Sequence, residues 1–400
     1  MNAPLLLTFN PGSSTIKIGL FSVTDEVPVR LGQGTIDFRH TPLRLHLLKG
    51  SEAREIALKA PVTDDLHAVL DETLNWFAEH FALNQLMCVG HRVVHGGDRY
   101  AGPVAIDDAT MTALDELVPL APLHQPQSLR LIRAIRHLRP QLPQSASFDT
   151  AFHRSQSDLV RRFAIPRKFF DQGIKRYGFH GLSYQFIAGR LAHEFADLAS
   201  GKVVVAHLGS GASLCALEHG LSRDTSMGFS TLDGIPMATR CGALDAGVVL
   251  HLLEQQGHSL KEVEDILYKQ SGLLGLSGIS ADSRELLASS RPEAGEALAV
   301  FALRVAGEVA RLATSLGGLE CFVLTAGIGE HQAPVRAAIC EHLAWMGVVL
   351  DPAANAADGN LARVISSAES RVTVLIIPTD EEQIIADEAV AVLHHKGAPQ

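Results

Sequence analysis

A surplus of positive charge is missing from this sequence. Its 34 Lys and Arg residues stand against 44 Asp and Glu residues, which gives a formal net charge of −10 with His neutral. Broad attraction to nucleic acid or to an anionic membrane depends on a basic surface. We therefore expect neither as a partner, and any anion that the protein binds must meet a local site.

Cysteine is scarce, and long hydrophobic runs are absent. The five cysteines are odd in number, widely spaced and without a CxxC pair, which indicates neither a disulfide framework nor a zinc knuckle. The first apolar run, Leu5–Leu7, is too short for a signal sequence. The longest apolar stretch, residues 300–316, is interrupted by Arg304, Glu308 and Arg311, so it does not predict a membrane span. We expect a soluble, cytoplasmic protein.

Aromatic residues are also few, at 6%, whereas apolar residues make up 46% of the 400 residues. A chain of this length exceeds one compact core, which predicts two domains. Strand-like runs rich in β-branched residues alternate with longer amphipathic stretches, the pattern of an α/β architecture. One amphipathic helix is predicted over Ser128–Arg139, with Ser128 as its N-cap and Pro140 behind it.

Two segments of the chain share a form. In Leu5–Phe21 and in Val203–Leu217, an apolar strand is followed by a polar residue, a Gly/Ser turn and a second strand. Each segment predicts a β-hairpin whose turn presents backbone N–H groups and small hydroxyls. The repetition indicates either two domains of related build or a coincidence, since Gly/Ser hairpins are common.

Three glycine-rich segments offer phosphate-binding groups. In Asn10–Lys17 a glycine is followed by three hydroxyl residues and Lys17, although the segment is not a Walker A motif. His207–Gly211 has a similar turn with less side-chain bulk. Leu324–His331 follows a predicted strand and precedes a predicted helix, Ala333–Met346, and open α/β sheets bind nucleotides at such turns. Each segment taken alone could equally be an ordinary turn.

Arg92 lies inside an apolar, strand-like run. An arginine held there requires an anionic partner, either an internal carboxylate or a substrate. His91 and His95 imitate the HxxxH spacing of zinc enzymes. We favour a strand and turn over zinc, because the glutamate of HExxH is missing and two glycines follow.

Three further polar residues stand where chemistry could occur. Asp149 follows a short strand and could order a metal, a water or a substrate oxygen, although an N-cap is the simpler interpretation. His180 lies on a loop before a helix, where a structural hydrogen bond is the ordinary role. Arg240 belongs to a long glycine-rich stretch, Asp224–Gly247, whose length indicates a functional loop.

In sequence order the chain contains TFNPGSSTIK, GHRVVHGG, APLHQPQSL, FDTAFH, RYGFHGLS, HLGSGAS, DTSMGFSTLDGIPMATRCG, SGLLGLSGIS, LTAGIGEH and PTDEE. This ordered set resembles the acetokinase family, which includes acetate, propionate and butyrate kinases. The matches extend from about Leu6 to Glu388, and residues 23–81 are the least diagnostic.

The resemblance implies a two-domain α/β fold like that of the actin-like and sugar-kinase-like ATPases, with the nucleotide in the interdomain cleft. The first domain, on the substrate side, would comprise residues 1–150 and a C-terminal helix over 381–400, and the nucleotide-binding domain residues 151–380. The implied reaction is the reversible in-line transfer of the ATP γ-phosphoryl group to acetate, giving ADP and acetyl phosphate. The resemblance also implies Mg²⁺, with Mn²⁺ as an alternative, and a homodimer.

The family's motifs assign roles to residues of this chain. Asp149 would be the catalytic carboxylate, and His180 and Arg240 would stabilise the phosphoryl group in transfer. The short-chain carboxylate would be bound by Arg92 and lined by Val94, Leu123 and Phe179. Asn10 and Glu381 would belong to the magnesium site through water. ATP would be surrounded by Lys17, His207, Leu208, Gly209, Ser210, Gly211, Asp282, Ser283, Arg284, Ala326, Gly327, Ile328, Gly329 and Glu330.

The sequence departs from the family's pattern at several positions. The replacements are Ser210 for Asn in HLGNG, Cys241 and Ala243 in TRSGD, Ala326 and His331 in GGIGEN, and Thr231 for Pro in FTPLEG. We expect retuned nucleotide binding rather than its loss. The reactivity of Cys241, beside Arg240, stays open, and an inert buried thiol is the alternative.

Acetate is the expected acceptor. One methylene changes discrimination by only about 1–3 kcal/mol, so propionate or butyrate is the alternative within the family. A non-metabolic, actin-like ATPase would explain the glycine turns equally well. It would give no common role to Arg92, Asp149 and Arg240.

Overall fold

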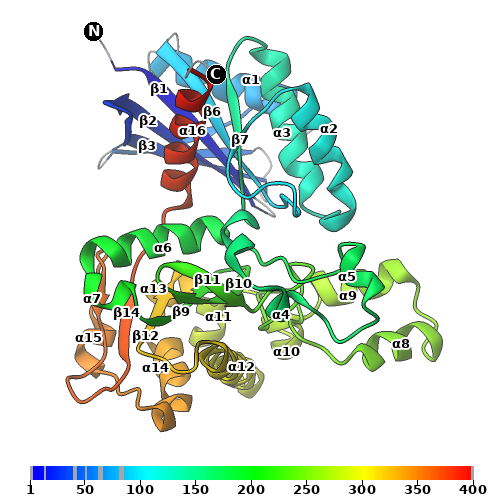
Figure 1. Cartoon of the computed structure of the whole chain (residues 1–400), viewed down its shortest axis with the longest axis vertical. Helices are drawn as coiled ribbons and strands as arrows, with labels where there is room; N and C mark the ends of the chain where they lie inside the picture. The colour runs from blue at the N-terminus through cyan, green and yellow to red at the C-terminus, as the bar shows by residue number, and fades with distance from the viewer. Residues whose placement is uncertain are drawn as a thin grey trace. The chain divides into compact units, whose positions relative to one another are not determined.

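The computed structural model describes residues 3–12, 15–38, 43–49, 52–61, 66–80 and 85–397. The chain divides into two compact units. Unit 1 comprises Met1–Phe152 and Asp380–Gln400, and unit 2 comprises His153–Thr379. Both units are mixed α/β structures, each built on one sheet, as Figure 1 shows. The predicted α/β fold is therefore confirmed.

The sheet of unit 1 has eight described strands in the order β5-β4-β3-β2-β1-β6-β8-β7. Their bounds are β1 Leu5–Pro11, β2 Thr15–Thr24, β3 Val27–Asp37, β4 Arg44–Lys49, β5 Glu52–Ala57, β6 Leu86–Val93, β7 Val104–Ala105 and β8 Gln144–Phe148. β1 and β2 form the predicted antiparallel hairpin, and β6 continues the sheet parallel to β1.

Helices cover both faces of this sheet. They are α1 (His67–His80), α2 (Asp108–Glu116), α3 (Gln125–Leu138) and α16 (Glu381–Gly397), with a 3-10 turn over Val118–Leu120. Alternate residues of a strand point to opposite faces. Accordingly, Leu5 and Leu7 of β1 join the core under α1 and α3, whereas Leu6 joins the core under α16. Gly90 allows α16 to approach β6, because a Cβ there would lie 2.7 Å from the side chain of Ile385.

Helix α3 corrects one boundary that the sequence predicted. It begins at Gln125, three residues before the expected start, and Pro126 occupies its first turn, where a missing backbone N–H costs nothing. Ser128 is therefore inside the helix and buried at 1% exposure rather than serving as the N-cap. Pro140 follows the helix, which ends at Leu138.

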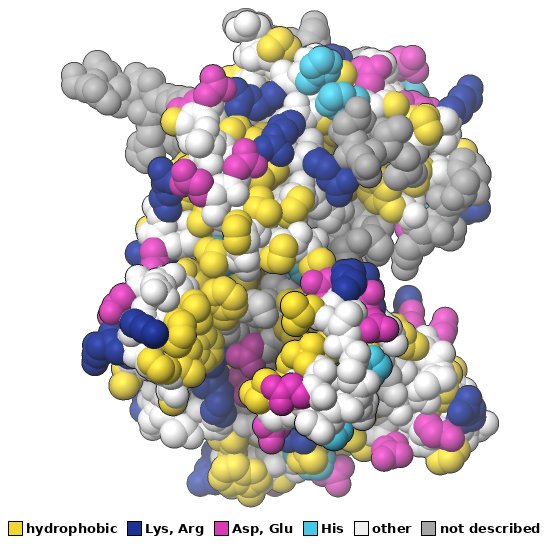
Figure 2. All heavy atoms as spheres, turned by 90° about the vertical axis from the view of Figure 1, so that its right-hand side faces the viewer, with side chains coloured by type: hydrophobic (Ala, Val, Ile, Leu, Met, Phe, Trp, Pro, Cys, Tyr) yellow, Lys and Arg dark blue, Asp and Glu magenta, His cyan; other side chains and the backbone are white. Residues whose placement is uncertain are grey.

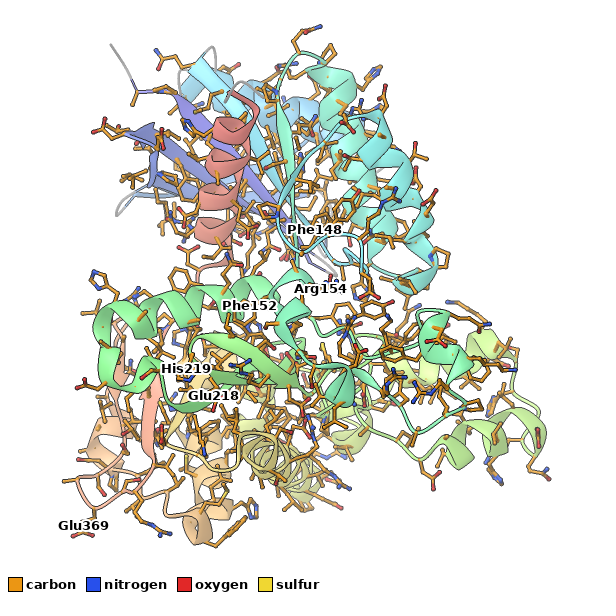
Figure 3. All side chains as sticks on the ribbon, viewed as in Figure 1. Phe148, Phe152, Arg154, Glu218, His219 and Glu369 are labelled. Atoms are coloured by element: carbon orange, nitrogen blue, oxygen red, sulfur yellow. The ribbon has the colours of Figure 1, made fainter. Side chains whose placement is uncertain are left out.

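The sheet of unit 2 has six described strands in the order β11-β10-β9-β12-β14-β13. Their bounds are β9 Lys202–Leu208, β10 Ala212–Glu218, β11 Leu221–Thr225, β12 Cys321–Thr325, β13 Arg363–Val364 and β14 Thr373–Ile376. Figure 3 labels Glu218 and His219, which mark the tight turn from β10 to β11.

Five strands of each unit follow the same plan. In unit 1, β3-β2-β1 are antiparallel neighbours and β6 and β8 extend the sheet parallel to β1. In unit 2, β11-β10-β9 are antiparallel neighbours and β12 and β14 extend it parallel to β9. The repeated hairpin in the sequence is therefore part of a shared five-strand topology.

Unit 2 carries most of the helices. They are α4 Asp158–Arg161, α5 Lys168–Asp171, α6 Gly181–Glu194, α7 Ala196–Ala199, α8 Ala246–Glu254, α9 Leu260–Lys269, α10 Gly272–Ser277, α11 Ser283–Ala288, α12 Pro292–Leu316, α13 Ala326–His331, α14 Ala333–His342 and α15 Pro352–Ala356. The 3-10 turns are Ala151–Ser155, at the division between units, and Ala344–Met346. Helix α12 buries one apolar stripe of ten residues along its 25-residue length. Among the described helices, none is long and apolar enough to cross a membrane.

Candidate active site

Arg92 and Asp149 form an ion pair at neighbouring strand ends of unit 1, in which Asp149 is buried and Arg92 is partly buried. Arg92 lies on β6, and Asp149 follows Phe148, the last residue of β8, which Figure 3 labels. The guanidinium donates from Nε to Oδ1 at 2.8 Å and from Nη2 to Oδ2 at 2.5 Å. The side chains are 14% and 2% exposed. Burial lowers the pKa of Arg92, but the charges of Asp149, Glu381 and Glu382 outweigh that effect and keep it above its ordinary value.

The same guanidinium reaches two further acceptors. Its Nη1 donates to Asn10 Oδ1 and to the carbonyl of Pro11, both at 3.1 Å. These contacts use four of the five N–H groups of Arg92, and among the described residues one N–H on Nη2 is left for another anion. Arg92 is therefore anchored and still able to donate.

Asn10 connects Arg92 to the first turn of α16. Its side-chain Nδ2 donates to Glu381 Oε2 at 2.7 Å and to Glu382 Oε1 at 2.8 Å, while its Oδ1 accepts from Arg92. The reverse amide orientation would put its NH₂ against a guanidinium and its oxygen against two carboxylates. The contacts therefore fix the orientation of this 3% exposed side chain.

Lys17 lies opposite Asn10 in the β1–β2 hairpin. The residue is exposed to solvent, but its ammonium group is partly desolvated by surrounding protein atoms. The charges of Glu382 first and Glu381 next outweigh that desolvation and the charge of Arg92, and raise the pKa of Lys17 above its ordinary value. The lysine therefore stays protonated at neutral pH. Ser13 and Ser14, the hydroxyls expected to bind phosphate beside it, lie outside the described residues.

The three residues expected to line the acyl pocket differ in exposure. Val94 is 3% exposed and Leu123 is 39% exposed, and both belong to unit 1. Phe179 is 1% exposed and belongs to unit 2, where its carbonyl accepts a hydrogen bond from His153 Nε2 at 3.0 Å.

The two histidines with HxxxH spacing are structural. His91 is buried on β6 with its Nε2 2.7 Å from Gln144 Oε1, and burial lowers its pKa to about 4. His95 accepts the backbone N–H of Gly97 through Nδ1, and burial lowers its pKa to about 4 as well. Within the described ranges, no group of three or more His, Cys, Asp or Glu side chains could hold a metal ion. The segment is a strand that ends at Val93, followed by a turn, as predicted.

His180 stands at the N-terminus of α6 in a left-handed backbone conformation, with φ 58° and ψ 24°. Such a conformation is uncommon for a residue other than glycine and is found where a side chain must be aimed. Its Nδ1 lies 2.8 Å from Ser213 Oγ. A Cβ added to Gly211 would lie 3.4 Å from His180 Nε2 and 3.7 Å from Arg240 Nη1. His180 and Arg240 therefore meet around the glycine turn.

His207, on β9, stacks on His180 with ring centroids 4.3 Å apart and planes 20° apart. Its Nδ1 is 2.9 Å from Ser183 Oγ, which is 2.9 Å from Thr379 Oγ1. The two imidazoles are thus each held by a serine hydroxyl at Nδ1.

The turn after β9 brings together the glycines of the second hairpin. Leu208 is completely buried, so only its backbone is available to a ligand. Gly209 donates its N–H to the carbonyl of Gly211 at 3.2 Å, and the carbonyl of Ser210 accepts from Ala238 at 3.2 Å. The turn is therefore joined by its backbone to the loop that carries Arg240.

That loop has no regular secondary structure between β11 and α8, but hydrogen bonds hold it. Arg240 Nη1 donates to the carbonyl of Thr231 at 3.1 Å. Gly272 packs so closely on the loop that a Cβ there would lie 2.1 Å from the carbonyl of Met237. Glycine is required at this position by both that contact and its φ of 61°.

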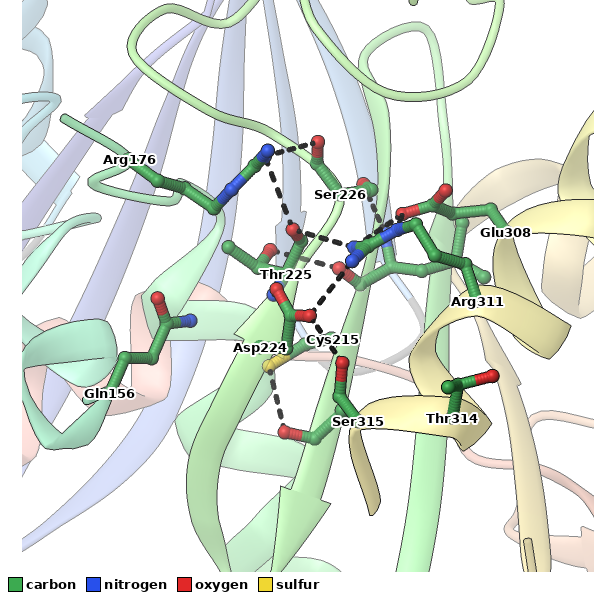
Figure 4. Close-up of polar contacts among 12 residues, drawn as sticks. Gln156, Arg176, Cys215, Asp224, Thr225, Ser226, Glu308, Arg311, Thr314 and Ser315 are labelled. Atoms are coloured by element: carbon green, nitrogen blue, oxygen red, sulfur yellow. Dashed lines mark hydrogen bonds and ion pairs between the residues drawn. The ribbon is translucent and has the colours of Figure 1, made fainter. Parts of the chain in front are cut away.

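Arg311 and Arg176 form hydrogen bonds with the residues where the loop begins, as Figure 4 shows. Arg311 of α12 donates to Asp224 Oδ2 at 2.8 Å, and Ser315 donates to the same oxygen at 2.7 Å. Arg176 donates to the carbonyl of Ser226 at 3.2 Å and to Asp233 Oδ2 at 3.2 Å. The loop that was expected to be functional is therefore held in place by side-chain hydrogen bonds.

The glycine cluster after β12 is itself helical, as α13. Ala326 begins it with φ 63°, and its N–H donates to Glu330 Oε1 at 2.7 Å. The same oxygen accepts from Thr325 Oγ1 at 3.3 Å and from the N–H of Thr379 at 3.2 Å. Gly327, Ile328 and Gly329 lie between these anchors. The carboxylate of Glu330 therefore joins the ends of β12 and β14, a task that the sequence did not reveal.

Asp282, Ser283 and Arg284 stand at the start of α11. Asp282 is the N-cap, and its Oδ1 accepts the N–H of Arg284 at 2.9 Å. The guanidinium of Arg284 is 80% exposed and pairs with the same carboxylate. The Ser283 hydroxyl is buried and accepts from Gln332 Nε2 at 2.6 Å. Of the three, Arg284 is the most open to a ligand.

Cys241 is half-buried, and its thiol donates to the carbonyl of Gly242 at 3.2 Å. Burial raises its pKa, which disfavours the thiolate. The inert alternative is therefore favoured. All five cysteines are free.

The carboxylates of Glu381 and Glu382 are the groups that suit a magnesium ion. Mg²⁺ usually keeps several waters and takes one or two protein carboxylates together with substrate phosphates. A pair of carboxylates bridged by the Asn10 amide fits such an outer arrangement. Glu382, which the sequence did not single out as a ligand, shares this position with Glu381.

The comparisons with known proteins agree over nearly the whole chain. The model of the acetokinase family matches residues 5–387. An acetate kinase of Rhodopseudomonas palustris is 46% identical over 390 residues, which cover 96% of each chain. An acetate kinase of Nitrobacter hamburgensis is 45% identical over 392 residues, covering 97% of this chain and 96% of the relative.

Solved structures also match over nearly the whole chain, at lower identity. An acetate kinase of Porphyromonas gingivalis is 32% identical with a TM-score of 0.87, covering 98% of this chain and 100% of its own. A propionate kinase of Francisella tularensis is 32% identical with a TM-score of 0.88, covering 96% of this chain and 98% of its own. Together with the charged cluster of unit 1 and the glycine turns of unit 2, these similarities lead to one conclusion: the chain belongs to the acetokinase family.

Proposed function

We propose that this protein is a kinase that transfers the γ-phosphoryl group of ATP reversibly to acetate, giving acetyl phosphate and ADP. The observation that carries the proposal is Arg92, a buried guanidinium anchored on three sides with an N–H left for a carboxylate. Four acetate kinases at 44–46% identity support the choice of acceptor.

Unit 1 would bind the acceptor. Arg92 holds one oxygen of the substrate carboxylate, and Asp149 orients the guanidinium through its bidentate contact. The second substrate oxygen is then free to attack the phosphorus. Lys17, kept protonated by neighbouring carboxylates, lowers the repulsion between the two anions.

Unit 2 would bind ATP and stabilise the phosphoryl group. The turn Gly209–Gly211 and the cluster Ala326–Glu330 lie close to the nucleotide, and Asp282–Arg284 borders it. His180 and Arg240, which meet around Gly211, donate to the equatorial oxygens of the group in transfer. Such transfer depends on position and electrostatics and needs no covalent enzyme intermediate.

Bound Mg²⁺ would neutralise phosphate charge. Glu381 and Glu382 would hold it through water, and Asn10 bridges the two carboxylates by donating to both, which offsets part of their mutual repulsion. Mn²⁺ has the same preference for oxygen ligands and serves as an alternative.

Propionate or butyrate is the second candidate acceptor. The propionate kinase of Francisella tularensis, at 32% identity, is a specific reason to test it. Thr231 stands where related enzymes carry proline, and its carbonyl accepts from Arg240. Acetate stays first because the relatives at the highest identities quoted above are acetate kinases.

The test is acyl phosphate formation, trapped with hydroxylamine, from ATP, Mg²⁺ and a panel of acetate, propionate, butyrate and isobutyrate. Arg92→Ala and Asp149→Ala should lose product. Arg133→Ala is the matched control, because Arg133 pairs with Asp115 on the exposed face of α3. If only a longer acid gave product, that acid and not acetate would be the acceptor. ATP binding without product from any acid would indicate a non-metabolic ATPase.

We also propose a homodimer in the cytoplasm, with α8 at the interface. This helix is rich in Val and Leu and yet has no buried residue, and Val248 and Leu250 are 41% and 56% exposed. Figure 2 shows hydrophobic side chains gathered on the side of unit 2 where α8 and α9 lie in Figure 1. Large exposed apolar surface marks an interaction site.

Light scattering measures the oligomeric state. Leu250→Asp should give a monomer, whereas Leu361→Asp, at a position 77% exposed outside this helix, should leave the dimer intact. A monomeric wild-type protein would contradict the proposal.

A further inference from the structure

We propose that Tyr184 and Ser213 form a hydroxyl relay that holds His180 as the neutral tautomer with its proton on Nε2. This inference rests on the proposed role of His180 toward the phosphoryl group. It adds two positioning residues and the protonation state that they impose.

The relay consists of two consecutive short contacts that share one serine oxygen. His180 Nδ1 lies 2.8 Å from Ser213 Oγ, and Ser213 Oγ lies 2.5 Å from the phenol oxygen of Tyr184. Ser213 and Tyr184 are both completely buried. Tyr184 lies one turn after His180 on α6, and its N–H donates to the carbonyl of His180 at 3.1 Å. One helical turn therefore presents both ends of the relay to the same serine of β10.

The order of donors follows from acidity. A phenol is a stronger acid than an aliphatic alcohol, so the O–H of Tyr184 donates to Ser213 Oγ. Ser213 then has its own proton for the next acceptor, and hydrogen bonds that run in one direction strengthen each other. That acceptor is His180 Nδ1. A neutral imidazole that accepts at Nδ1 carries its proton on Nε2.

The tautomer matches what lies on the other side of the ring. His180 Nε2 faces the glycine turn, where a Cβ on Gly211 would lie 3.4 Å away beside Arg240 Nη1. Phosphoryl oxygens only accept hydrogen bonds, so a ring nitrogen that meets them must donate. The relay therefore turns His180 into a fixed hydrogen-bond donor, with no proton transfer in the reaction.

Removing the Tyr184 hydroxyl isolates this effect. In Tyr184→Phe the ring remains, but Ser213 Oγ loses its donor and can accept from His180 Nδ1–H, which leaves Nε2 without a proton. We expect kcat to fall about 10-fold or more, with KM for ATP and acetate within about 2-fold, because the loss is confined to the transition state. Ser213→Ala should have a similar effect.

The matched control is Tyr177→Phe. Tyr177 is also buried, at 5% exposure, and its hydroxyl donates to the carbonyl of Gly173 at 2.9 Å in a part-buried contact. The variant therefore loses one phenol hydrogen bond that does not involve His180. We expect its kcat to stay within about 2-fold of the wild-type value.

The tautomer of His180 is the measurement that distinguishes the relay from a purely structural role of Tyr184, because loss of packing alone would not change it. Long-range ¹H–¹⁵N NMR of histidine-labelled protein, at about pH 8 and above the ordinary histidine pKa of about 6.5, distinguishes the two neutral forms and the cation. His180→Gln identifies the signal among the 19 histidines. We expect Nε2–H in the wild type and a shift toward Nδ1–H in Tyr184→Phe.

A wild-type Nδ1–H tautomer or a cation at that pH would overturn the relay, as would an unchanged tautomer and kcat in both variants. These outcomes are separable from the proposed function. The NMR experiment needs no turnover, so loss of acetate phosphorylation in the wild type would leave the relay standing.

Discussion

The two units share the same five-strand topology but carry different side chains at the strand ends. At the end of the two parallel strands of unit 1, Arg92 and Asp149 meet as opposite charges. At the corresponding ends in unit 2, a single carboxylate, Glu330, accepts from backbone N–H groups beside β12 and β14. Around it stand glycine turns and hydroxyl groups, and among the described residues its nearest cationic partner is the exposed His331, 3.8 Å from Glu330 Oε2.

Under the proposed function, this difference lets one scaffold serve two kinds of anion. A small carboxylate has few oxygens and would meet the fixed charge of one guanidinium in unit 1. A polyphosphate has many oxygens along its length and would meet the glycine-rich turns of unit 2, together with His180 and Arg240. The shared strands set the positions, and the residues at their ends set the ligand.

The largest expected effect comes from breaking the charged pair. Arg92→Met and Asp149→Leu each leave one buried charge unpaired, so each should lower the free energy of unfolding by about 3–5 kcal/mol. The double variant should recover most of that loss, because two apolar side chains pack without an unpaired charge. Urea unfolding at pH 7 measures all three proteins.

In these three variants, the loss of activity should not follow the loss of stability. All three variants should lose on the order of 10³-fold or more in kcat/KM for acetate, the double variant included. An active double variant would show that the pair serves the fold and not the acceptor.

A smaller effect is expected at the carboxylate of unit 2. Glu330→Ala should lower the free energy of unfolding by about 1–3 kcal/mol, because it leaves N–H groups of Ala326 and Thr379 without their acceptor. Glu330→Gln keeps an oxygen there and should retain most of the stability. In unit 1, by contrast, Asp149→Asn should not be tolerated, because the charge opposite Arg92 is what matters. If Glu330→Gln and Asp149→Asn changed the thermal unfolding temperature equally, the proposed distinction between the units would be wrong.

Acid should affect unit 1 more than unit 2. Burial lowers the pKa of His91 and His95 in unit 1, and of His153 in unit 2, to about 4. The unfolded chain, with histidine pKa near 6.5, binds more protons between these values, so the stability is fully present above about pH 6.5 and is lost as the pH falls toward 4. Each histidine accounts for roughly 3 kcal/mol over that range.

Hydrogen exchange at pH 6.5 and at pH 5 tests this difference. Protection of the unit 1 core should fall more steeply than protection of the unit 2 core, and His91→Phe should flatten the fall in unit 1. The ring of His91 stacks on Phe9, so a phenyl group preserves that contact. An equal pH slope in both units would contradict the prediction.

The smallest effect is expected on the surface of unit 1. Arg133 pairs with Asp115, and the two side chains are 48% and 47% exposed. Arg133→Ala should change the free energy of unfolding by less than about 0.5 kcal/mol and leave kcat unchanged, because solvent screens the pair. Set beside Arg92→Met, this result would show that burial, and not the residue type, makes the charge matter.

Local sequence patterns predicted the strand pairs of the two hairpins correctly. In Leu5–Phe21 and Val203–Leu217 two strand-like runs follow each other within a few residues, so nearby residues alone define the pairing. The start of α3 was wrong because Pro126 in the first turn outweighed the capping potential of Ser128.

The contacts inside the site were beyond sequence reasoning. Arg92 and Asp149 were each identified, but nothing in the chain predicts that residues 57 positions apart bind one another. Ser213 closes the motif HLGSGAS but received no role of its own, and Tyr184 was not singled out, because a serine in a strand and a tyrosine in a helix are ordinary residues until the fold brings both to His180.

Helix α16 belongs to unit 1 but follows all of unit 2 in the chain, so unit 1 is completed only after unit 2 has been synthesised. All of His153–Thr379 leaves the ribosome before α16 does. Until then Asn10 lacks both glutamates, and Leu6 and Phe21 lack the helix that covers them. A chain that ends at Thr379 therefore lacks the helix that completes unit 1, a form suited to chaperone binding, and greater protease sensitivity of β1 in this truncated protein than in the full chain would reveal it.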